Sequence, residues 1–393
     1  MRLVDISEFF SDFGGGVRTY VHQKLEASAK TGIETIIIAP GPADRREKRL
    51  GGEVIWVRSP VLPFDHRYHL FADMRPVHAL LDEISPSFIE GSSTWRGGWM
   101  AATWRGVAGR ALFLHQDPVA VYPQSLFSPT VSAARIDGLF GWFWAYMRRL
   151  ARRFDATVVP SEFFARRLQR FGVEEPIVCP LGVDRSAFAH TLRDASLRRE
   201  MLASCGVDDP NATLFLSVGR HHLEKRLPML IKAHQDYVRT HPAGLFVIGD
   251  GPMWRTVNRA ATRAPGVYIA GPESDRQALA RRLASADILV HGGAAETYGL
   301  VVAEALSSGL PIVTPDIGGA SDLAHPAFGE TYRYGRWNEL ADAMRRIAGR
   351  SRDDLSLAAR AGAHRIKTPD EHFSMLFGHY ASLARDAAAR RAA

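Results

Sequence analysis

The sequence predicts an α/β protein with two domains, each built on a doubly wound parallel sheet. Two observations carry this prediction. The chain has 393 residues, which is more than one ordinary hydrophobic core accommodates. Short apolar runs alternate with helix-forming stretches along most of its length, and this alternation is typical of parallel sheets. The composition, with 46% hydrophobic and 23% charged residues, is that of a globular protein.

The predicted elements follow one another as strand and helix in both halves. Strands are expected in the first half at 2–6, 35–39, 54–57, 88–90, 111–115, 156–159 and 177–180, and in the second half at 214–218, 246–248, 267–270, 288–290 and after Pro311. The clearest helices are expected at 17–30, 76–84, 99–107, 227–239, 275–285 and 300–306. Residues 184–211 are charged and carry little strand signal, so we place the linker there, between domains at 1–190 and 207–369.

The net charge, the cysteines and the lengths of the apolar runs limit the classes of function that this sequence can have. A net charge of +7 favours anionic partners, but no nucleic-acid recognition motif is present. The two cysteines, Cys179 and Cys205, have neither metal-ligand spacing nor a disulfide framework. The first apolar run is interrupted by Asp5 and Glu8, unlike a signal peptide. No run approaches the roughly 20 apolar residues of a membrane span. We expect a cytoplasmic protein, at most peripheral to a membrane.

Residues 285–319 carry the strongest functional signal. A predicted strand ends in a turn, Glu296 follows, and a helix begins near Gly299 with Glu304 in its first turns. The unpaired amides of this helix N-terminus, from Gly299 through Leu300 to Val301, suit an anion such as a phosphate. Carboxylates beside an anion site suit a ligand with both hydroxyls and phosphate. Sugar nucleotides are ligands of this kind.

Three other loops follow predicted strands, where open α/β sheets bind ligands. Gly15 and Gly16 lie in a glycine loop after the first strand, which can bring backbone close to a phosphate or sugar. His115 ends the strand at 111–115. Arg220 and Lys225 can neutralise a departing diphosphate. Since the chain has no Asp-x-Asp pair to hold a metal, we expect the site to work without one and without a cofactor.

The segment 142–153 places four aromatic residues before a cluster of arginines. Such a segment can rest on an anionic membrane surface. A core-facing helix with solvated arginines is the alternative. The sequence leaves both open.

Taken in order, these motifs resemble those of a known enzyme family. The set comprises the glycines after the first strand, His115, the Ser-Val-Gly-Arg…Glu-Lys segment at 217–225, Gly-Asp-Gly-Pro at 249–252, and the Glu-x7-Glu pair with Tyr298-Gly299-Leu300. It resembles the retaining glycosyltransferases of family 4. The resemblance implies the GT-B fold, in which two Rossmann-like domains face each other across a deep cleft. It also implies that a C-terminal helix, about 370–393, returns to the first domain.

The resemblance implies a role for each motif residue. Glu296 would contact donor-sugar hydroxyls and Glu304 the ribose. Arg220 and Lys225 would hold the diphosphate, assisted by the glycine loop and by amides of Leu300 and Val301. Glu273 falls where the family contacts the base, and His115 would lie near the reacting face of the sugar. The site departs from the family at His291-Gly292-Gly293, where Pro-Ser is common, and at Leu181, which replaces the Asn of an Asn-Gly-Val-Asp motif.

We therefore expect a hexosyltransferase that moves a sugar, with mannose favoured, from a GDP- or UDP-sugar to a saccharide or lipid-linked acceptor. The acceptor would be read by loops 60–75 and 91–106. Two alternatives share the fold: a UDP-sugar epimerase, and a non-catalytic nucleotide-sugar-binding partner of another transferase.

Overall fold

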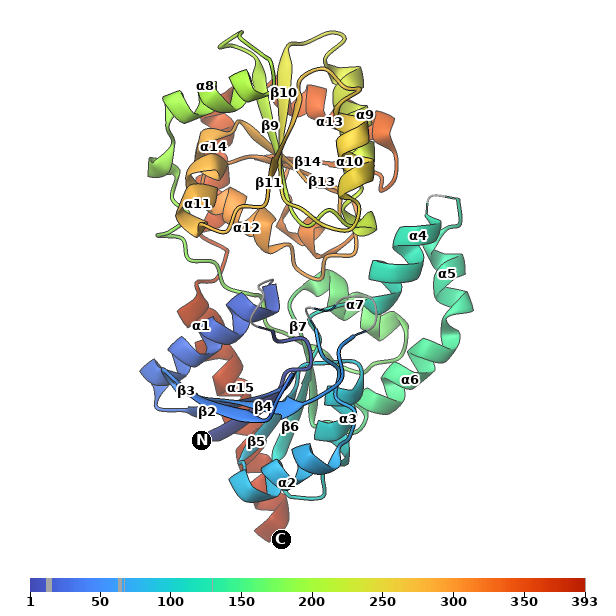
Figure 1. Ribbon diagram of the computed structural model, residues 1–393, viewed down its shortest axis with the longest axis vertical. Helices are drawn as coiled ribbons and strands as arrows, with labels where there is room; N and C mark the ends of the chain where they lie inside the picture. Colours follow the sequence, from blue (N-terminus) through green and yellow to red (C-terminus); the bar gives the residue numbers. More distant parts are fainter. Residues whose placement is uncertain (12–15, 63–65, 67, 129, 393) are drawn as a thin grey trace.

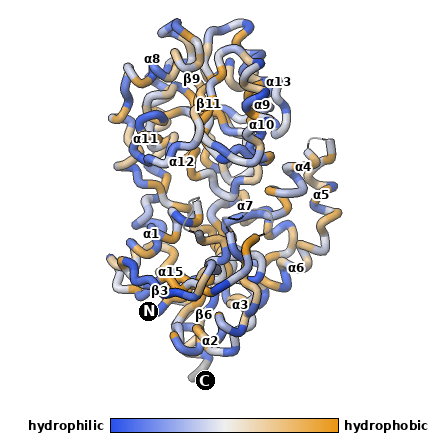
Figure 2. The backbone as a smooth tube through the Cα atoms, viewed as in Figure 1, coloured by the Kyte–Doolittle hydropathy of each residue, from blue (hydrophilic) through white to orange (hydrophobic). Residues whose placement is uncertain are grey.

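The structure, a computed structural model, describes residues 1–11, 16–62, 66, 68–128 and 130–392. Two sheets form the centres of two α/β domains, stacked along the long axis of the molecule (Figure 1). Apolar stretches gather along the strands of both domains, as Figure 2 shows. This pattern is expected for parallel strands, which are covered by helices on both faces.

The first sheet has eight strands in the order β3-β4-β2-β1-β5-β6-β7-β8. They are β1 (Arg2–Ile6), β2 (Glu34–Gly41), β3 (Arg45–Arg49), β4 (Gly52–Arg58), β5 (Phe88–Gly91), β6 (Gly109–Phe113), β7 (Ala156–Val159) and β8 (Ile177–Val178). Their pairings are parallel except for β3, which is antiparallel to β4.

Helices cover both faces of this sheet. Residues of α1 (Gly16–Thr31) and α15 (Pro369–Ala392) pack with Leu3 and Phe88 on one face. Residues of α2 (Arg75–Ile84) and α3 (Arg96–Thr103) pack with Val4 and Ile89 on the other. Helix α6 (Gly141–Ala151) packs against the β6 and β7 end of the sheet, with α7 (Glu162–Arg170) beside it. Because successive strand residues point to opposite faces, neighbouring residues of β1 reach different helix layers.

The second sheet has six parallel strands in the order β11-β10-β9-β12-β13-β14. They are β9 (Thr213–Val218), β10 (Ala243–Ile248), β11 (Val267–Gly271), β12 (Ile288–Val290), β13 (Ile312–Pro315) and β14 (Gly329–Tyr332). Helices α9 (Leu227–Tyr237), α10 (Trp254–Ala261) and α13 (Trp337–Ala348) pack on one face. Helices α8 (Ala195–Ser204), α11 (Arg276–Ser285), α12 (Leu300–Ser307) and α14 (Arg352–Ala363) pack on the other.

The chain passes between the domains twice, and the two crossings lie side by side. The amide of Val183 donates to the carbonyl of Lys367 over 2.8 Å. Helix α15 then runs back under the first sheet, where the ring of Tyr380 stacks on Phe88 and its hydroxyl donates to Glu90. Helix α8 lies within the segment expected to be a linker. Arg198 of α8 pairs with the buried Asp287 at 2.6 Å and so fastens this helix to the second domain.

Two further segments differ from the sequence prediction. The sequence RREKR of β3 has no apolar residue, yet it forms an edge strand by hydrogen bonding to β4. Helix α3 ends at Thr103 instead of Val107, because Trp104 is extended and buried. None of the helices in the described residues is both long and apolar enough to cross a membrane.

Candidate active site

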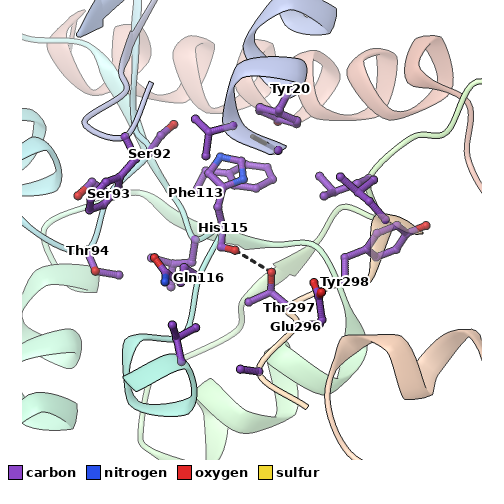
Figure 3. A pocket seen from close by; sticks show the side chains of 18 of the residues that line it. Tyr20, Ser92, Ser93, Thr94, Phe113, His115, Gln116, Glu296, Thr297 and Tyr298 are labelled. Atoms are coloured by element: carbon purple, nitrogen blue, oxygen red, sulfur yellow. Dashed lines mark hydrogen bonds between the residues drawn. The ribbon is translucent and has the colours of Figure 1, made fainter. Parts of the chain in front are cut away.

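A cavity of about 300 Å³ lies where the two domains meet. The loops after β1, β5 and β6 and the start of α1 line it on one side, and residues 295–300 line it on the other (Figure 3). Both walls therefore come from the carboxyl ends of parallel strands, where this architecture places ligand sites.

His115 forms part of the first wall. Its ring stacks on Phe113, with centroids 4.3 Å apart, and meets the edge of Tyr20 at 4.7 Å. Burial lowers the pKa of His115 to about 3, so its imidazole is neutral at physiological pH. It can exchange hydrogen bonds with a sugar or an acceptor but does not act there as a cation.

A run of hydroxyl residues, Ser92 to Thr94, follows β5 along the same wall. The hydroxyl of Ser92 lies within hydrogen-bonding distance of two buried carboxylates, Asp5 at 2.7 Å and Glu90 at 2.6 Å. The ammonium of Lys24 lies between these carboxylates at 2.7 Å from each. This buried network ties β1, β5 and α1 together beneath the cavity and fixes the loop that carries the hydroxyls.

The second wall is the loop that enters α12. Gly299 adopts a left-handed backbone with φ of 95°, and an added Cβ would lie 3.0 Å from the Cβ of Ala320. Glycine is favoured in this conformation because it has no Cβ. Gly299 and Leu300 line the cavity, so the N-terminus of α12, with its orphan amides and positive dipole end, faces it.

Thr297 connects the two walls. Its hydroxyl donates to the carbonyl of His115 over 2.7 Å, as the dashed line in Figure 3 shows. A second contact lies outside the cavity, where Asp322 accepts from the amide of Phe163 at 2.6 Å and pairs with Arg166 at 3.1 Å. The domains are thus held in contact both at Thr297 and at Asp322.

Glu296 lies in the second wall and is in direct contact with the ammonium of Lys225. Burial opposes ionisation of both groups. Their mutual attraction outweighs it, so that the pKa of Lys225 is raised and the pKa of Glu296 is lowered. Glu224 lines the cavity nearby, 3.9 Å from the same ammonium, and burial raises its pKa.

The structure brings together some of the residues predicted from the sequence. Gly16, His115, Glu296, Gly299 and Leu300 line the cavity. Arg220, Lys225, Glu273, Val301 and Glu304 belong to the same end of the second sheet but lie outside the cavity lining. Gly15 lies outside the described residues.

Two of the predicted acidic residues have arginine partners that the sequence did not indicate. Glu304 is buried and pairs with Arg276 at 2.9 Å. Burial nevertheless raises the pKa of Glu304, with Arg276 opposing it. Glu273 pairs with Arg282 at 3.0 Å. Both arginines lie on α11, so this helix controls the charge around the predicted nucleoside contacts.

Sequence reasoning gave no role to the lining residues Tyr20 and Thr297, and it placed Ser92, Ser93 and Thr94 only within the predicted acceptor loop 91–106, without naming them. A signal was present for the three that follow β5, because polar residues directly after a buried parallel strand fall at the ligand-binding edge. Tyr20 lies one turn into α1 and belongs to no motif.

Two Rossmann-like domains that meet around an interdomain cavity are the architecture of the GT-B glycosyltransferases. The comparisons with known proteins agree. Residues 14–187 match the family model described as Glycosyltransferase Family 4, and residues 212–350 match the model described as Glycosyl transferases group 1. The chain belongs to the family 4 glycosyltransferases.

The similarity to individual relatives extends over nearly the whole chain. The chain is 30% identical to a GDP-mannose-dependent alpha-mannosyltransferase of Mycobacterium tuberculosis, over 97% of this chain and 96% of that protein. It is 27% identical to a GDP-mannose-dependent alpha-(1-6)-phosphatidylinositol dimannoside mannosyltransferase of the same species, over 94% and 96%. The structure of sucrose-phosphate synthase from Thermosynechococcus elongatus superposes with a TM-score of 0.78 at 18% identity, covering 98% of this chain and 99% of that one. This last likeness concerns the fold alone.

Proposed function

We propose that this glycosyltransferase moves mannose from GDP-mannose to a hydroxyl of a saccharide or lipid-linked acceptor, with retention of anomeric configuration. The donor is supported by the full-length relatives, whose names specify GDP-mannose. Lipid-linked acceptors are supported by the relative that acts on a phosphatidylinositol dimannoside.

The observation that carries the proposal is the cavity between the domains, with Glu296 and His115 on opposite walls. In the proposed complex the mannosyl group occupies this cavity. Glu296 accepts hydrogen bonds from sugar hydroxyls, and the neutral imidazole of His115 lies beside the reacting face. Glu304 lies toward the ribose and Glu273 toward the base.

Transfer builds negative charge on the departing diphosphate. Arg220 and Lys225 would meet that charge together with the amides of Leu300 and Val301 at the start of α12. Gly16 opens α1 at the cavity and would add an amide from the first domain. In this proposal these groups take the place of a metal ion, so that transfer proceeds without one.

The acceptor side of the proposal involves a membrane surface. Residues 119–151, here called the arm, form the π-helical turn η1 (Ala120–Gln124) and helices α4 (Ser125–Phe127), α5 (Ala133–Leu139) and α6 at one side of the first domain (Figure 1). The aromatic side chains of Phe143 and Trp144 are buried in the core. Phe143 and Trp144 are therefore not available for the aromatic membrane face expected on 142–153, whereas Trp142 is exposed.

The exposed apolar surface of the arm comes mainly from other residues. Five large side chains are about half or more exposed: Tyr122 (57%), Leu126 (60%), Phe127 (49%), Leu139 (74%) and Trp142 (65%). The arm contains one acidic residue, Asp137, which is buried and paired with Arg167. Exposed arginines Arg135 and Arg149 add positive charge. Apolar side chains beside exposed cations fit an anionic lipid surface.

Ligand-induced thermal stabilisation, with and without magnesium, tests the donor. GDP and GDP-mannose at a hundred times their dissociation constants should each add about 2.7 kcal/mol to the free energy of unfolding. UDP and ADP should add less at equal concentration. Stabilisation that requires magnesium, or that is confined to another nucleotide, would contradict the metal-free or the GDP assignment respectively.

A transfer assay with labelled GDP-mannose and a phosphatidylinositol mannoside tests the reaction. We expect Glu296→Ala to lower kcat/KM at least about 100-fold, as expected when hydrogen bonds to a charged group are lost in the transition state. The epimerase alternative predicts release of free sugar without an acceptor. The non-catalytic alternative predicts donor binding without turnover and no effect of the substitution on the activity of a partner.

A further inference from the structure

Lys225 and Glu296 are each other's partner, although the proposed function gives them different ligands. Lys225 is assigned to the donor diphosphate and Glu296 to the donor sugar. Their charged groups are in direct contact, and their side chains are only 14% and 23% exposed. A donor therefore has to replace this ion pair on both sides when it binds.

The charge of Glu296 depends strongly on Lys225. In the described part of the chain, the groups that lower the pKa of Glu296 are Lys225 and, less strongly, His291. The Nε2 atom of His291 lies 3.8 Å from the Glu296 carboxylate. Burial, however, lowers the pKa of His291 to about 4. With Lys225 in place the imidazole is therefore neutral at physiological pH, and the charge that compensates Glu296 comes from Lys225.

The backbone holds the two groups in place. An added Cβ at Gly292 would lie 2.3 Å from the carbonyl oxygen of Lys225, so the loop after β12 rests directly on the backbone of Lys225. A Cβ at Gly293 would lie 3.1 Å from His291 Nε2 and 3.4 Å from Cδ of Lys225. The His-Gly-Gly sequence that departs from the family pattern thus allows the close packing around the pair.

The geometry points to a selective exchange of partners, in which an intact nucleotide sugar satisfies both Lys225 and Glu296 while a nucleoside diphosphate satisfies Lys225 alone. With the sugar present, its hydroxyls replace the ammonium at Glu296. With the bare diphosphate, a largely buried carboxylate loses its cation, which is costly. The pair therefore favours donor over product and assists product release. This inference rests on the proposed function, because it needs a diphosphate at Lys225 and sugar hydroxyls at Glu296.

Calorimetric titration of the full-length protein with GDP and with GDP-mannose, without acceptor, tests the exchange. Glu296→Gln removes the charge and keeps a hydrogen-bonding side chain. We expect this variant to bind GDP about 10-fold more tightly than the wild type does, and GDP-mannose no more tightly. The ratio of the two dissociation constants then changes about 10-fold, which corresponds to about 1.4 kcal/mol. In a Lys225→Met background the same substitution should leave the ratio unchanged, because the pair no longer exists.

Glu224→Gln is the matched control. Glu224 is also near the ammonium of Lys225, at 3.9 Å, but it is not the direct partner. Removing the charge of Glu224 changes the electrostatic potential at the site for both ligands alike. The affinities for GDP and GDP-mannose should therefore shift equally, to within about twofold. Thermal unfolding of each variant verifies folding. An unchanged ratio in Glu296→Gln, or an equal change of ratio in Glu224→Gln, would overturn the inference.

The titrations of the wild-type protein distinguish a wrong proposed function from a wrong exchange. If the wild-type protein binds UDP and UDP-glucose instead of the guanine ligands, the donor assignment is wrong. The same ratio measured with those two ligands then still decides whether the exchange occurs. A wild-type protein that binds no nucleotide overturns both.

Discussion

Lys24 illustrates how single residues prepare the site without touching it. Its ammonium is fully buried between Asp5 and Glu90, under the loop that carries Ser92. Burial raises the pKa of Asp5 to about 6 despite the lysine, while Lys24 holds the pKa of Glu90 below its ordinary value against the opposing effect of burial. The ammonium of Lys24 thus supplies the positive charge that allows the two carboxylates to be buried side by side.

We predict that Lys24→Met destabilises the protein by about 3–5 kcal/mol, because it leaves buried carboxylates without a cation. Denaturant unfolding followed by circular dichroism measures this change. Lys30→Met on the same helix is the control, because its partner Asp370 and Lys30 itself are both exposed, and it should unfold like the wild type. Equal stability of the two variants would show that the buried network contributes little.

At this scale the sequence predicted the residues that stand in recognisable motifs. Glu296 and the start of α12 line the cavity, as the position of their loop at the carboxyl end of a parallel strand led us to expect. The Lys225–Glu296 pair was not foreseen, because 71 residues separate its members and only the order of strands in the sheet brings them together. The same reason hides Arg276 as the partner of Glu304.

At the scale of elements, sequence predicts best where periodicity and capping agree. Helix α11 begins at Arg276 after the side chain of Asp275 caps it, and α12 begins directly after Gly299, both as expected. The edge strand β3 and helix α8 were missed. β3 has no apolar residue to signal burial. Helix α8 lies in a charged segment, and it is attached by the buried side chains of Met201 and Leu202 and by the ion pair of Arg198 with the distant Asp287.

The exposed apolar residues of the arm can be tested for membrane binding by substitution. Leu139→Asp and Trp142→Asp replace exposed apolar side chains with acidic ones and should reduce co-sedimentation with vesicles that contain anionic lipid by at least about fivefold. This corresponds to about 1 kcal/mol, a modest part of the burial of one large side chain. Leu357→Asp on α14, also exposed at 61%, is the control and should sediment like the wild type. Equal sedimentation of all variants would exclude the arm as the membrane contact.

At the scale of the whole molecule, the two domains are held together by contacts between residues that are far apart in the sequence. Thr297 reaches the carbonyl of His115 beside the cavity, and Asp322 meets the N-terminus of α7 outside it. The carboxylate of Asp322 completes a helix end of the other domain, where the amides and the dipole favour negative charge.

We predict that Asp322→Ala weakens closure by about 1 kcal/mol, roughly fivefold in the closing equilibrium, as expected for one charge-assisted hydrogen bond near the surface. Small-angle X-ray scattering should show a larger radius of gyration, and the KM for the donor should rise. Arg166→Ala removes only the exposed ion pair and should have a smaller effect. An unchanged radius in Asp322→Ala would show that the remaining contacts suffice.

The paired crossings between the domains make the second domain an insertion into the first. Val183 and Lys367 are hydrogen-bonded neighbours, so everything between them leaves the first domain and returns at one place. A polypeptide unit whose two ends meet can be exchanged as a cassette without rerouting the remaining chain. The second domain can therefore change, in evolution or in the laboratory, while the first domain stays intact.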